Sequence, residues 1–151
     1  DGNTLFHRKM EGCLSKGSVI VYVWRKKDAE IVTEQLQSAG IDGGVVCYHG
    51  GMDANARSKA QSKFMRGKVR IIVATVAFGL GINKADVKGV IHMCLPSSPE
   101  NYQQEIGRAG RDGNKAQAIA LCLRQELIHK QSLSFSDKIS ESQIKTFFKN
   151  M

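Results

Sequence analysis

The sequence predicts an α/β fold in which a mostly parallel sheet is flanked by helices. Short apolar runs rich in β-branched residues alternate with segments that carry a helical spacing of apolar residues. Such runs are typical of strands buried on both faces, and their alternation with helices predicts βαβ units. With 151 residues, 42% of them hydrophobic, the chain fits one domain, residues 1–151, with a core of its own.

Five strands are expected, each built on a short apolar run. They cover residues 19–23, 45–48, 70–74, 90–95 and 118–123. A weak helical pattern precedes the first strand, and a weakly patterned helical tail follows the last one.

Three helices should connect these strands. Asp28 is expected to cap the first helix and Gly40 to end it. Asp53 and Gly67 should have the same two roles in the second helix. The third should begin after Ser98, at a proline, and end near the next glycine.

Charge and cysteine spacing limit the class of protein. The chain has 22 Lys and Arg against 14 Asp and Glu, which indicates a polyanionic partner. Seven of these basic residues fall between residues 54 and 85, where there is no carboxylate. The four cysteines are far apart, so we expect free thiols, an intracellular protein and no metal site. No apolar run approaches the length of a membrane span, so no membrane partner is expected.

The most informative segment is QEIGRAGRDG, residues 104–113, at the end of the third predicted helix. It places Arg108 and Arg111 three residues apart between glycines. Guanidiniums at this spacing are neighbours on a helical or turn segment, and their planar forks match phosphate oxygens. Taken alone, these residues favour a phosphate site and a flexible basic loop equally.

A second glycine-bearing segment, VATVAFGLGINK at residues 73–84, opens directly from the third predicted strand. Ligands of α/β sheets bind beyond the carboxyl ends of the strands, so this loop is a second candidate site.

The two segments closely resemble the second RecA-like lobe, or helicase C-terminal domain, of RecQ-type ATP-dependent DNA helicases. The order of YVWR (residues 22–25), YHGGM (48–52) and the two glycine-bearing segments also matches, so the likeness spans roughly residues 17–123. RNA-directed relatives usually have His where this chain has Gln104, which favours DNA as the substrate.

The resemblance implies that Arg108 and Arg111 act as arginine fingers. They would meet the γ-phosphate of ATP, bound with Mg²⁺ by the first lobe, and stabilise the charge of phosphoryl transfer. Gln104 would position the attacking water or tie the cleft together. Many family members have Asp at position 83 and Pro at position 85, where this chain has Asn and Ala. The residues expected to couple the nucleotide to this lobe are Asn83, Asp86 and Gly107.

The resemblance also implies a grip on the backbone of single-stranded or forked DNA that reads no sequence. Thr75 and the glycines after it would offer a hydroxyl and backbone N–H groups to a strand phosphate. The expected nucleic-acid contacts are Arg25, His49, Gly50, Thr75 and Gly79.

Two further features have two interpretations each. Lys59, Lys63 and Arg66 form a stripe that is either a solvated helix face or a nucleic-acid contact. Trp24 stands where the family commonly has a small polar residue, and it either packs in the core or stacks on a base.

Residues 1–151 contain neither a G-x-x-x-x-G-K-[ST] phosphate loop nor an Asp-Glu-x-His block, which belong to the first lobe of such enzymes. The expected function is therefore the second motor lobe of an ATP-dependent DNA helicase, inactive in isolation and partnered by its first lobe. DNA repair and recombination, and a nuclear location in a eukaryote, follow from the resemblance. The alternatives are a non-catalytic module that binds single strands and an RNA-directed helicase lobe.

Overall fold

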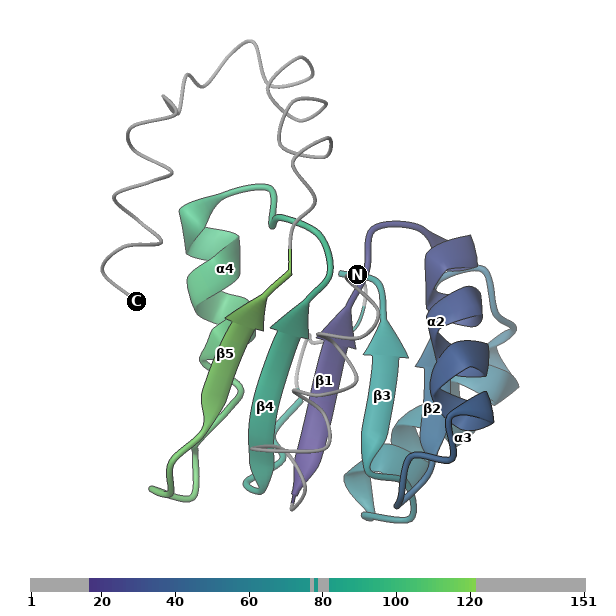
Figure 1. Cartoon of the computed structure of the whole chain (residues 1–151), viewed down its shortest axis with the longest axis horizontal. Helices are drawn as coiled ribbons and strands as arrows, with labels where there is room; N and C mark the ends of the chain where they lie inside the picture. Colours follow the sequence, from purple (N-terminus) through teal and green to yellow (C-terminus); the bar gives the residue numbers. More distant parts are fainter. Residues whose placement is uncertain (1–16, 77, 79–81, 122–151) are drawn as a thin grey trace, which may run out of the picture.

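The chain folds as a parallel sheet with helices on both faces (Figure 1). The computed structural model describes residues 17–76, 78 and 82–121. In chain order its elements are β1 (Ser18–Tyr22), α2 (Lys26–Ser38), β2 (Val45–Tyr48), α3 (Ala54–Met65), β3 (Ile71–Ala74), β4 (Val87–His92), α4 (Pro99–Ile106) and β5 (Gln117–Ala120). The strands lie in the order β2-β3-β1-β4-β5, and every neighbouring pair is parallel. The predicted α/β fold is confirmed.

Two predicted segments lie outside the described residues, namely the helix before the first strand and the helical tail. The assignment of residues 1–151 to one domain therefore stays a prediction. None of the helices among the described residues is long and apolar enough to cross a membrane.

Apolar side chains pack on both faces of the sheet. Val19 of β1 packs with Leu36 of α2 on one face, and Ile20 packs with Phe64 of α3 on the other. The end of α4 joins the second layer through Ile106. Figure 1 shows α2 on the near side of the sheet and α3 and α4 on the far side. Because helices cover both faces, β1 and β3 are buried along their whole length, as their apolar runs predicted.

Two of the predicted helix caps are confirmed. The Asp53 side chain accepts a hydrogen bond from the backbone N–H of Ala56 (2.9 Å). The Ser98 hydroxyl accepts one from the N–H of Asn101 (3.1 Å), and a proline follows it at the first helical position. Both side chains satisfy N–H groups that have no partner inside the helix.

The prediction that Asp28 caps the first helix is wrong. α2 begins at Lys26 with Arg25 as its N-cap, and Asp28 lies in the first turn. There its carboxylate accepts a hydrogen bond from the backbone N–H of Arg25 (3.1 Å). An acidic side chain stabilises the first turn as well as the cap position, so it marks a helix start without fixing the first residue.

The last two strands begin earlier than predicted. β4 covers Val87–His92 instead of residues 90–95, and β5 ends at Ala120 within the described residues instead of at 123. The backbone N–H of Met93 still bonds to the carbonyl of Tyr22 (2.9 Å), and Cys94 is buried. An apolar run therefore continues beyond the paired residues, and hydrophobicity alone does not show where a strand ends.

Candidate nucleotide and nucleic-acid sites

The predicted site residues lie at two places on the domain. Thr75 follows the carboxyl end of β3, while Asp86 lies at the amino edge of the sheet, where its carbonyl accepts from the N–H of Ser18 (3.1 Å). The second glycine-bearing segment therefore runs from one edge of the sheet to the other. Gly79 lies within this segment but outside the described residues.

Arg111 joins the two glycine-bearing segments. Its Nη1 donates to the carbonyl of Ile82 (3.4 Å) and to Oδ1 of Asn83 (3.1 Å). Its Nε donates to the carbonyl of Gly107 (3.2 Å), at the end of α4. Arg111 thus contacts two other residues predicted for the nucleotide side, Asn83 and Gly107, and Arg111 itself is exposed.

The turn that carries Arg111 is fixed to the start of β4. Gly110 has a φ of +71°, a left-handed conformation that favours glycine, and its N–H bonds to the carbonyl of Val87 (3.0 Å). On the other side of the turn, Lys88 Nζ lies 2.6 Å from a carboxylate oxygen of Asp112. These contacts hold the arginine segment against the sheet, so it is not a free basic loop.

Arg108 lies deeper than Arg111. It is half-buried, and its buried Nε has no hydrogen-bond partner among the described residues. Burial raises the pKa of Tyr22 to about 12, and the neighbouring positive charge of Arg108 opposes this rise. The Tyr22 hydroxyl in turn donates to the carbonyl of Phe78 (3.2 Å), in the second glycine-bearing segment. A guanidinium carries five N–H donors, so half-buried Arg108 has donors besides this buried Nε.

The other predicted nucleotide residues have different surroundings. Gln104 is exposed on the last turn of α4. Asp86 contacts Lys84 (2.8 Å) and Ser18 (3.2 Å) and neither arginine. Burial would raise the pKa of Asp86, but hydrogen bonding to Lys84 and the charge of Lys84 outweigh it and keep the pKa below its ordinary value. Asp86 thus holds Lys84, the last residue of the second glycine-bearing segment.

The predicted nucleic-acid residues follow three neighbouring strands at the carboxyl edge. Arg25 follows β1, His49 follows β2 and Thr75 follows β3. Their strands lie side by side, and the N–H of Thr75 bonds to the carbonyl of Tyr48 (3.3 Å). The structure therefore brings these three loops to one edge.

His49 supports this edge through contacts within the protein. Its Nδ1 accepts from the N–H of Gly51 (3.1 Å), and its Nε2 lies 3.1 Å from Oε1 of Glu30. Since both ring nitrogens have partners and the side chain is buried, His49 holds the loop while Gly50 is exposed. Of His49 and Gly50, it is therefore the backbone of Gly50 that a nucleic acid can reach.

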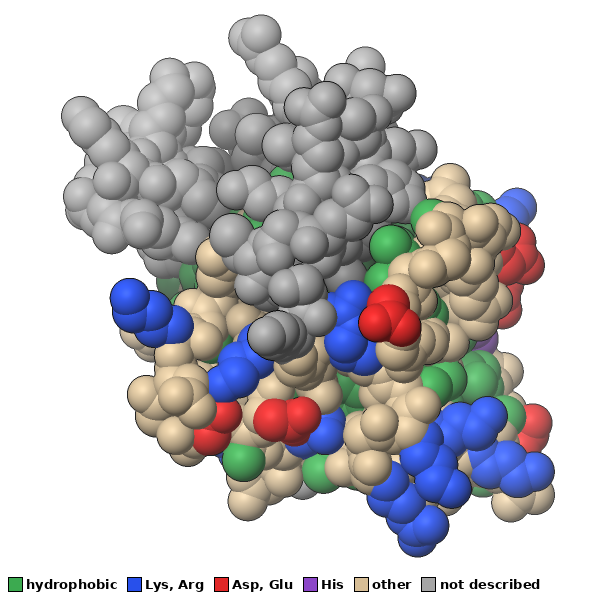
Figure 2. Space-filling model, turned by 60° about the horizontal axis from the view of Figure 1, so that its bottom comes forward, with side chains coloured by type: hydrophobic (Ala, Val, Ile, Leu, Met, Phe, Trp, Pro, Cys, Tyr) green, Lys and Arg blue, Asp and Glu red, His purple; other side chains and the backbone are tan. Residues whose placement is uncertain are grey.

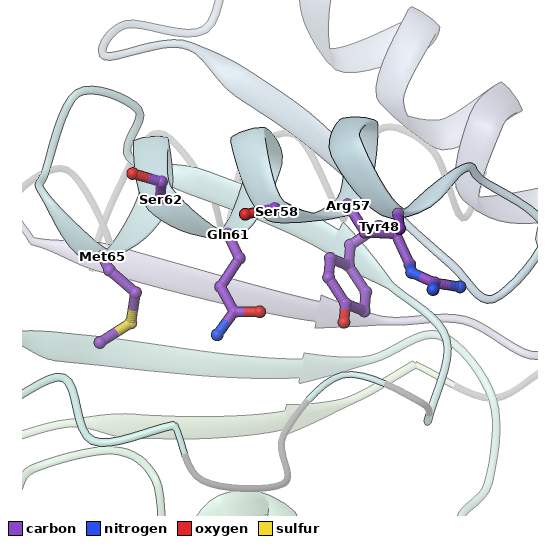
Figure 3. Close-up of a pocket in the computed structure, with 7 residues that line it drawn as sticks. Tyr48, Arg57, Ser58, Gln61, Ser62 and Met65 are labelled. Atoms are coloured by element: carbon purple, nitrogen blue, oxygen red, sulfur yellow. The ribbon is translucent and has the colours of Figure 1, made fainter.

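A shallow depression of about 400 Å³ lies beside this edge, and no sequence motif predicted it. Tyr48, Gln61 and Met65 point into the same region from β2 and α3 (Figure 3). Arg57 also lines it and donates to the carbonyl of Gly50 (3.3 Å). The basic, carboxylate-free stretch of the sequence was the signal that could have identified Arg57.

The basic stripe on α3 is on the surface. Lys59, Lys63 and Arg66 are all exposed. Figure 2 shows lysine and arginine side chains gathered on the side of the molecule where α3 lies. The exposure of these three side chains fits both interpretations of the stripe, a solvated helix face and a nucleic-acid contact.

A buried ionisable pair connects β4 to the helix that carries the arginines. His92 Nε2 lies 2.5 Å from Oε2 of Glu105, and the His92 ring packs 5.2 Å from the ring of Tyr22 and 5.1 Å from that of Tyr102. His92 Nδ1 has no hydrogen-bond partner within the described part of the chain. Sequence reasoning missed this pair, because His92 lies 13 residues before Glu105 and no motif links the two.

A family model described as the helicase conserved C-terminal domain matches residues 7–113. The chain belongs to this family. Both glycine-bearing segments, with Arg108 and Arg111, lie within the matched residues.

Relatives of this helicase domain are mostly named as RecQ-type enzymes. A Caenorhabditis elegans protein named putative ATP-dependent DNA helicase Q1 is 49% identical over 113 residues, which are 75% of this chain and 17% of that protein. ATP-dependent DNA helicase RecQ of Haemophilus influenzae is 43% identical over 102 residues, or 68% and 16% of the two chains. A mimivirus protein that is 44% identical over 103 residues (68% and 18%) is named a putative ATP-dependent RNA helicase. The helicase domain therefore spans less than a fifth of these relatives.

Solved structures agree with the fold. The Escherichia coli DEAD-box protein SrmB matches with a TM-score of 0.71 and 25% identity, over 94% of this chain and 85% of that one. Mycobacterium smegmatis helicase Lhr, solved with single-stranded DNA and AMP-PNP, matches with a TM-score of 0.68 and 25% identity, over 83% and 18%. The prediction of a RecA-like second motor lobe of the RecQ type is confirmed.

Proposed function

We propose that this helicase domain completes the ATP site of an ATP-dependent DNA helicase. ATP and Mg²⁺ would be held mainly by the first lobe of the same protein, and Arg108 and Arg111 would act on the transferred phosphate. Guanidinium groups are donors only and cannot ligate a cation, so the metal must be held by other groups. Bound ATP supplies the phosphoryl group, and this chain supplies positive charge and orientation.

The observation that carries the proposal is the fixed position of Arg111. Its hydrogen bonds to Ile82, Asn83 and Gly107 orient the side chain, yet it remains exposed. A guanidinium held in advance costs little reorganisation when charge develops on a phosphoryl group. Arg108 adds a second guanidinium with a buried Nε that has no partner among the described residues. The exposed and pre-oriented Arg111, with half-buried Arg108 three residues before it, supports a role at a surface that another lobe covers.

The carboxyl edge of the sheet supports a second proposed role, the grip on a single strand. Arg25 contributes charge there, and exposed Gly50 can offer a backbone N–H to phosphate oxygens. Thr75 lies at the same edge but is only 8% exposed, so its hydroxyl would reach a phosphate only if the strand enters this edge closely. The related helicase Lhr is bound to single-stranded DNA in its solved structure. Contacts of this kind hold the backbone without reading bases, which suits an enzyme that moves along its track.

The second glycine-bearing segment offers a path between the two roles. Near its start, the backbone N–H of Thr75 bonds to Tyr48 of β2. Near its end, Asn83 accepts a hydrogen bond from Arg111. A change in the position of Arg111 during hydrolysis would therefore act on the second glycine-bearing segment. This segment begins at the carboxyl edge of the sheet, where we propose that the single strand binds. Alternating closure of the two lobes would then convert ATP turnover into movement.

Arg108→Ala in the full-length protein tests the proposal. We expect DNA-stimulated ATP turnover to fall on the order of a thousandfold while single-strand binding is retained. The matched control is Lys115→Ala, which removes an exposed positive charge at a position with no proposed role. Turnover close to that of the parent would contradict the proposed role of Arg108.

The same assay, run with RNA in place of DNA, separates the alternatives. Stimulation by DNA and not by RNA is expected. Stimulation by RNA alone would favour an RNA-directed lobe, and binding without turnover in the parent would favour a non-catalytic module. The proposal also includes forked DNA as a substrate and a role in DNA repair and recombination. It further includes an intracellular location, which in a eukaryote would be the nucleus.

A further inference from the structure

Trp24 is on the surface of the domain, although it directly continues a buried strand. Tyr22 and Val23 are almost fully buried, whereas 54% of Trp24 is exposed. A large indole in the core would be covered by its neighbours, so of the two interpretations of Trp24 the core position is excluded.

A second exposed apolar residue occupies the equivalent position on the next strand. β1 and β3 pair with Tyr22 opposite Ala74, and Trp24 and Val76 each follow that pair by two residues. Val76 is 63% exposed. Because β1 and β3 are neighbouring strands, about 4.8 Å apart, both residues extend from the same part of the carboxyl edge of the sheet. We call them the Trp24–Val76 platform.

Positive charge surrounds this platform. Arg25, Lys26 and Lys27 follow Trp24 directly, and all three are exposed. Lys26 also reaches the β2–α3 loop, since a Cβ added to Gly51 would lie 2.9 Å from its Cδ. Basic side chains therefore extend from the residues after Trp24 to the loop that exposes Gly50.

We propose that the Trp24–Val76 platform stacks on an unpaired base of single-stranded DNA. An aromatic face beside cations fits a nucleotide, because the base covers the indole while its phosphates meet the positive charge. An apolar protein partner would gain nothing from the three cations. The inference rests on the proposed single-strand grip and adds to it a contact that every base can make. Such a contact is compatible with movement along the strand, because stacking does not depend on sequence.

Tryptophan fluorescence tests the platform directly, because Trp24 is the only tryptophan in the 151-residue chain. The probes are a thymidine oligonucleotide and an abasic oligonucleotide with the same number of phosphates. Both should bind at low salt, but only the thymidine strand should quench Trp24. Stacking is worth about 1–3 kcal/mol per base, so the thymidine strand should bind about 5- to 150-fold more tightly.

Substitutions separate stacking from charge. Trp24→Ala should lower the affinity for the thymidine strand to that for the abasic strand, and Trp24→Phe should keep part of the difference. Ile31→Ala is the matched control, because Ile31 is an exposed apolar residue on α2. Far-UV circular dichroism checks that each variant is folded.

The outcomes that contradict the platform differ from those that contradict the grip. Equal affinity and equal quenching by the two oligonucleotides would overturn the platform and leave the backbone grip standing. A preference for thymidine that survives Trp24→Ala would also overturn it. Absence of binding to either strand at low salt would overturn both the platform and the proposed grip.

Discussion

Arg111 donates a hydrogen bond to Oδ1 of Asn83 across 28 residues of sequence, with a donor–acceptor distance of 3.1 Å. This contact joins the end of the second glycine-bearing segment, residues 73–84, to the turn that carries Arg111. The side chain at position 83 therefore helps to set where the guanidinium points. Asn and Asp both place an acceptor oxygen there, so an Asp at this position is compatible with the same contact.

Removal of this acceptor should impair catalysis more than folding. Asn83→Leu in the full-length protein leaves Arg111 without one of its orienting partners, and a small misplacement costs on the order of a hundredfold in turnover. Steady-state ATPase assays measure the effect. Asn83→Asp is the control, because it keeps an acceptor oxygen and should retain turnover. Equal loss in both variants would contradict an orienting role.

The His92–Glu105 pair should stabilise the lobe. Removing one partner leaves the other buried without compensation, so His92→Ala should lower the free energy of unfolding by about 3–5 kcal/mol. Urea denaturation measures this change, and Glu34→Ala, at an exposed position on α2, is the control. In a double-mutant cycle with Glu105→Ala, the two losses should be clearly non-additive. Additive losses would show that the two side chains do not stabilise each other.

Asp112 should make stability depend on pH in the acidic range. Hydrogen bonding to Lys88 and Asn114 lowers the pKa of Asp112 to about 2. Because the folded-state pKa lies below the unfolded value of about 3.9, the stabilisation is present above that value. It is lost as the pH falls through about 2. The urea midpoints of the parent and Asp112→Asn should differ at pH 7 and converge near pH 2. A constant difference would contradict the contribution of this carboxylate.

Much of the fold could be predicted, because it depends on local chemistry. The buried apolar runs of β1 and β3, and caps such as Asp53 and Ser98, are visible in the sequence. Asp28 misled the prediction because an acid suits the first turn as well as the cap. The fourth strand was shifted because its apolar run extends beyond the paired residues.

The site was predictable only in part, because its contacts are tertiary. The resemblance predicted Arg108 and Arg111 as site residues, but no pattern places Asn83 against Arg111 or His92 against Glu105. The exposure of Trp24 was equally hidden, since an aromatic residue that follows a buried strand commonly belongs to the core.

The isolated segment should bind single-stranded DNA weakly and hydrolyse no ATP. Phosphate contacts release counterions, so the logarithm of the binding constant should fall linearly with the logarithm of salt concentration, by about 0.7 per contact. Fluorescence anisotropy at several salt concentrations measures the slope, and Arg25→Ala should reduce it by about 0.7 if Arg25 meets a phosphate. Salt-insensitive binding would count against a backbone grip. Measurable hydrolysis by a clean preparation would contradict the division of labour between lobes.

The central claim is that Arg111 acts on a phosphate held by another lobe. The most direct measurement is DNA-stimulated ATP turnover of the full-length protein with Arg111→Ala, alongside ATP and DNA affinities. We predict that turnover falls on the order of a thousandfold with DNA affinity retained, and that adding Arg108→Ala causes little further loss. Turnover within a fewfold of the parent would contradict the arginine-finger assignment.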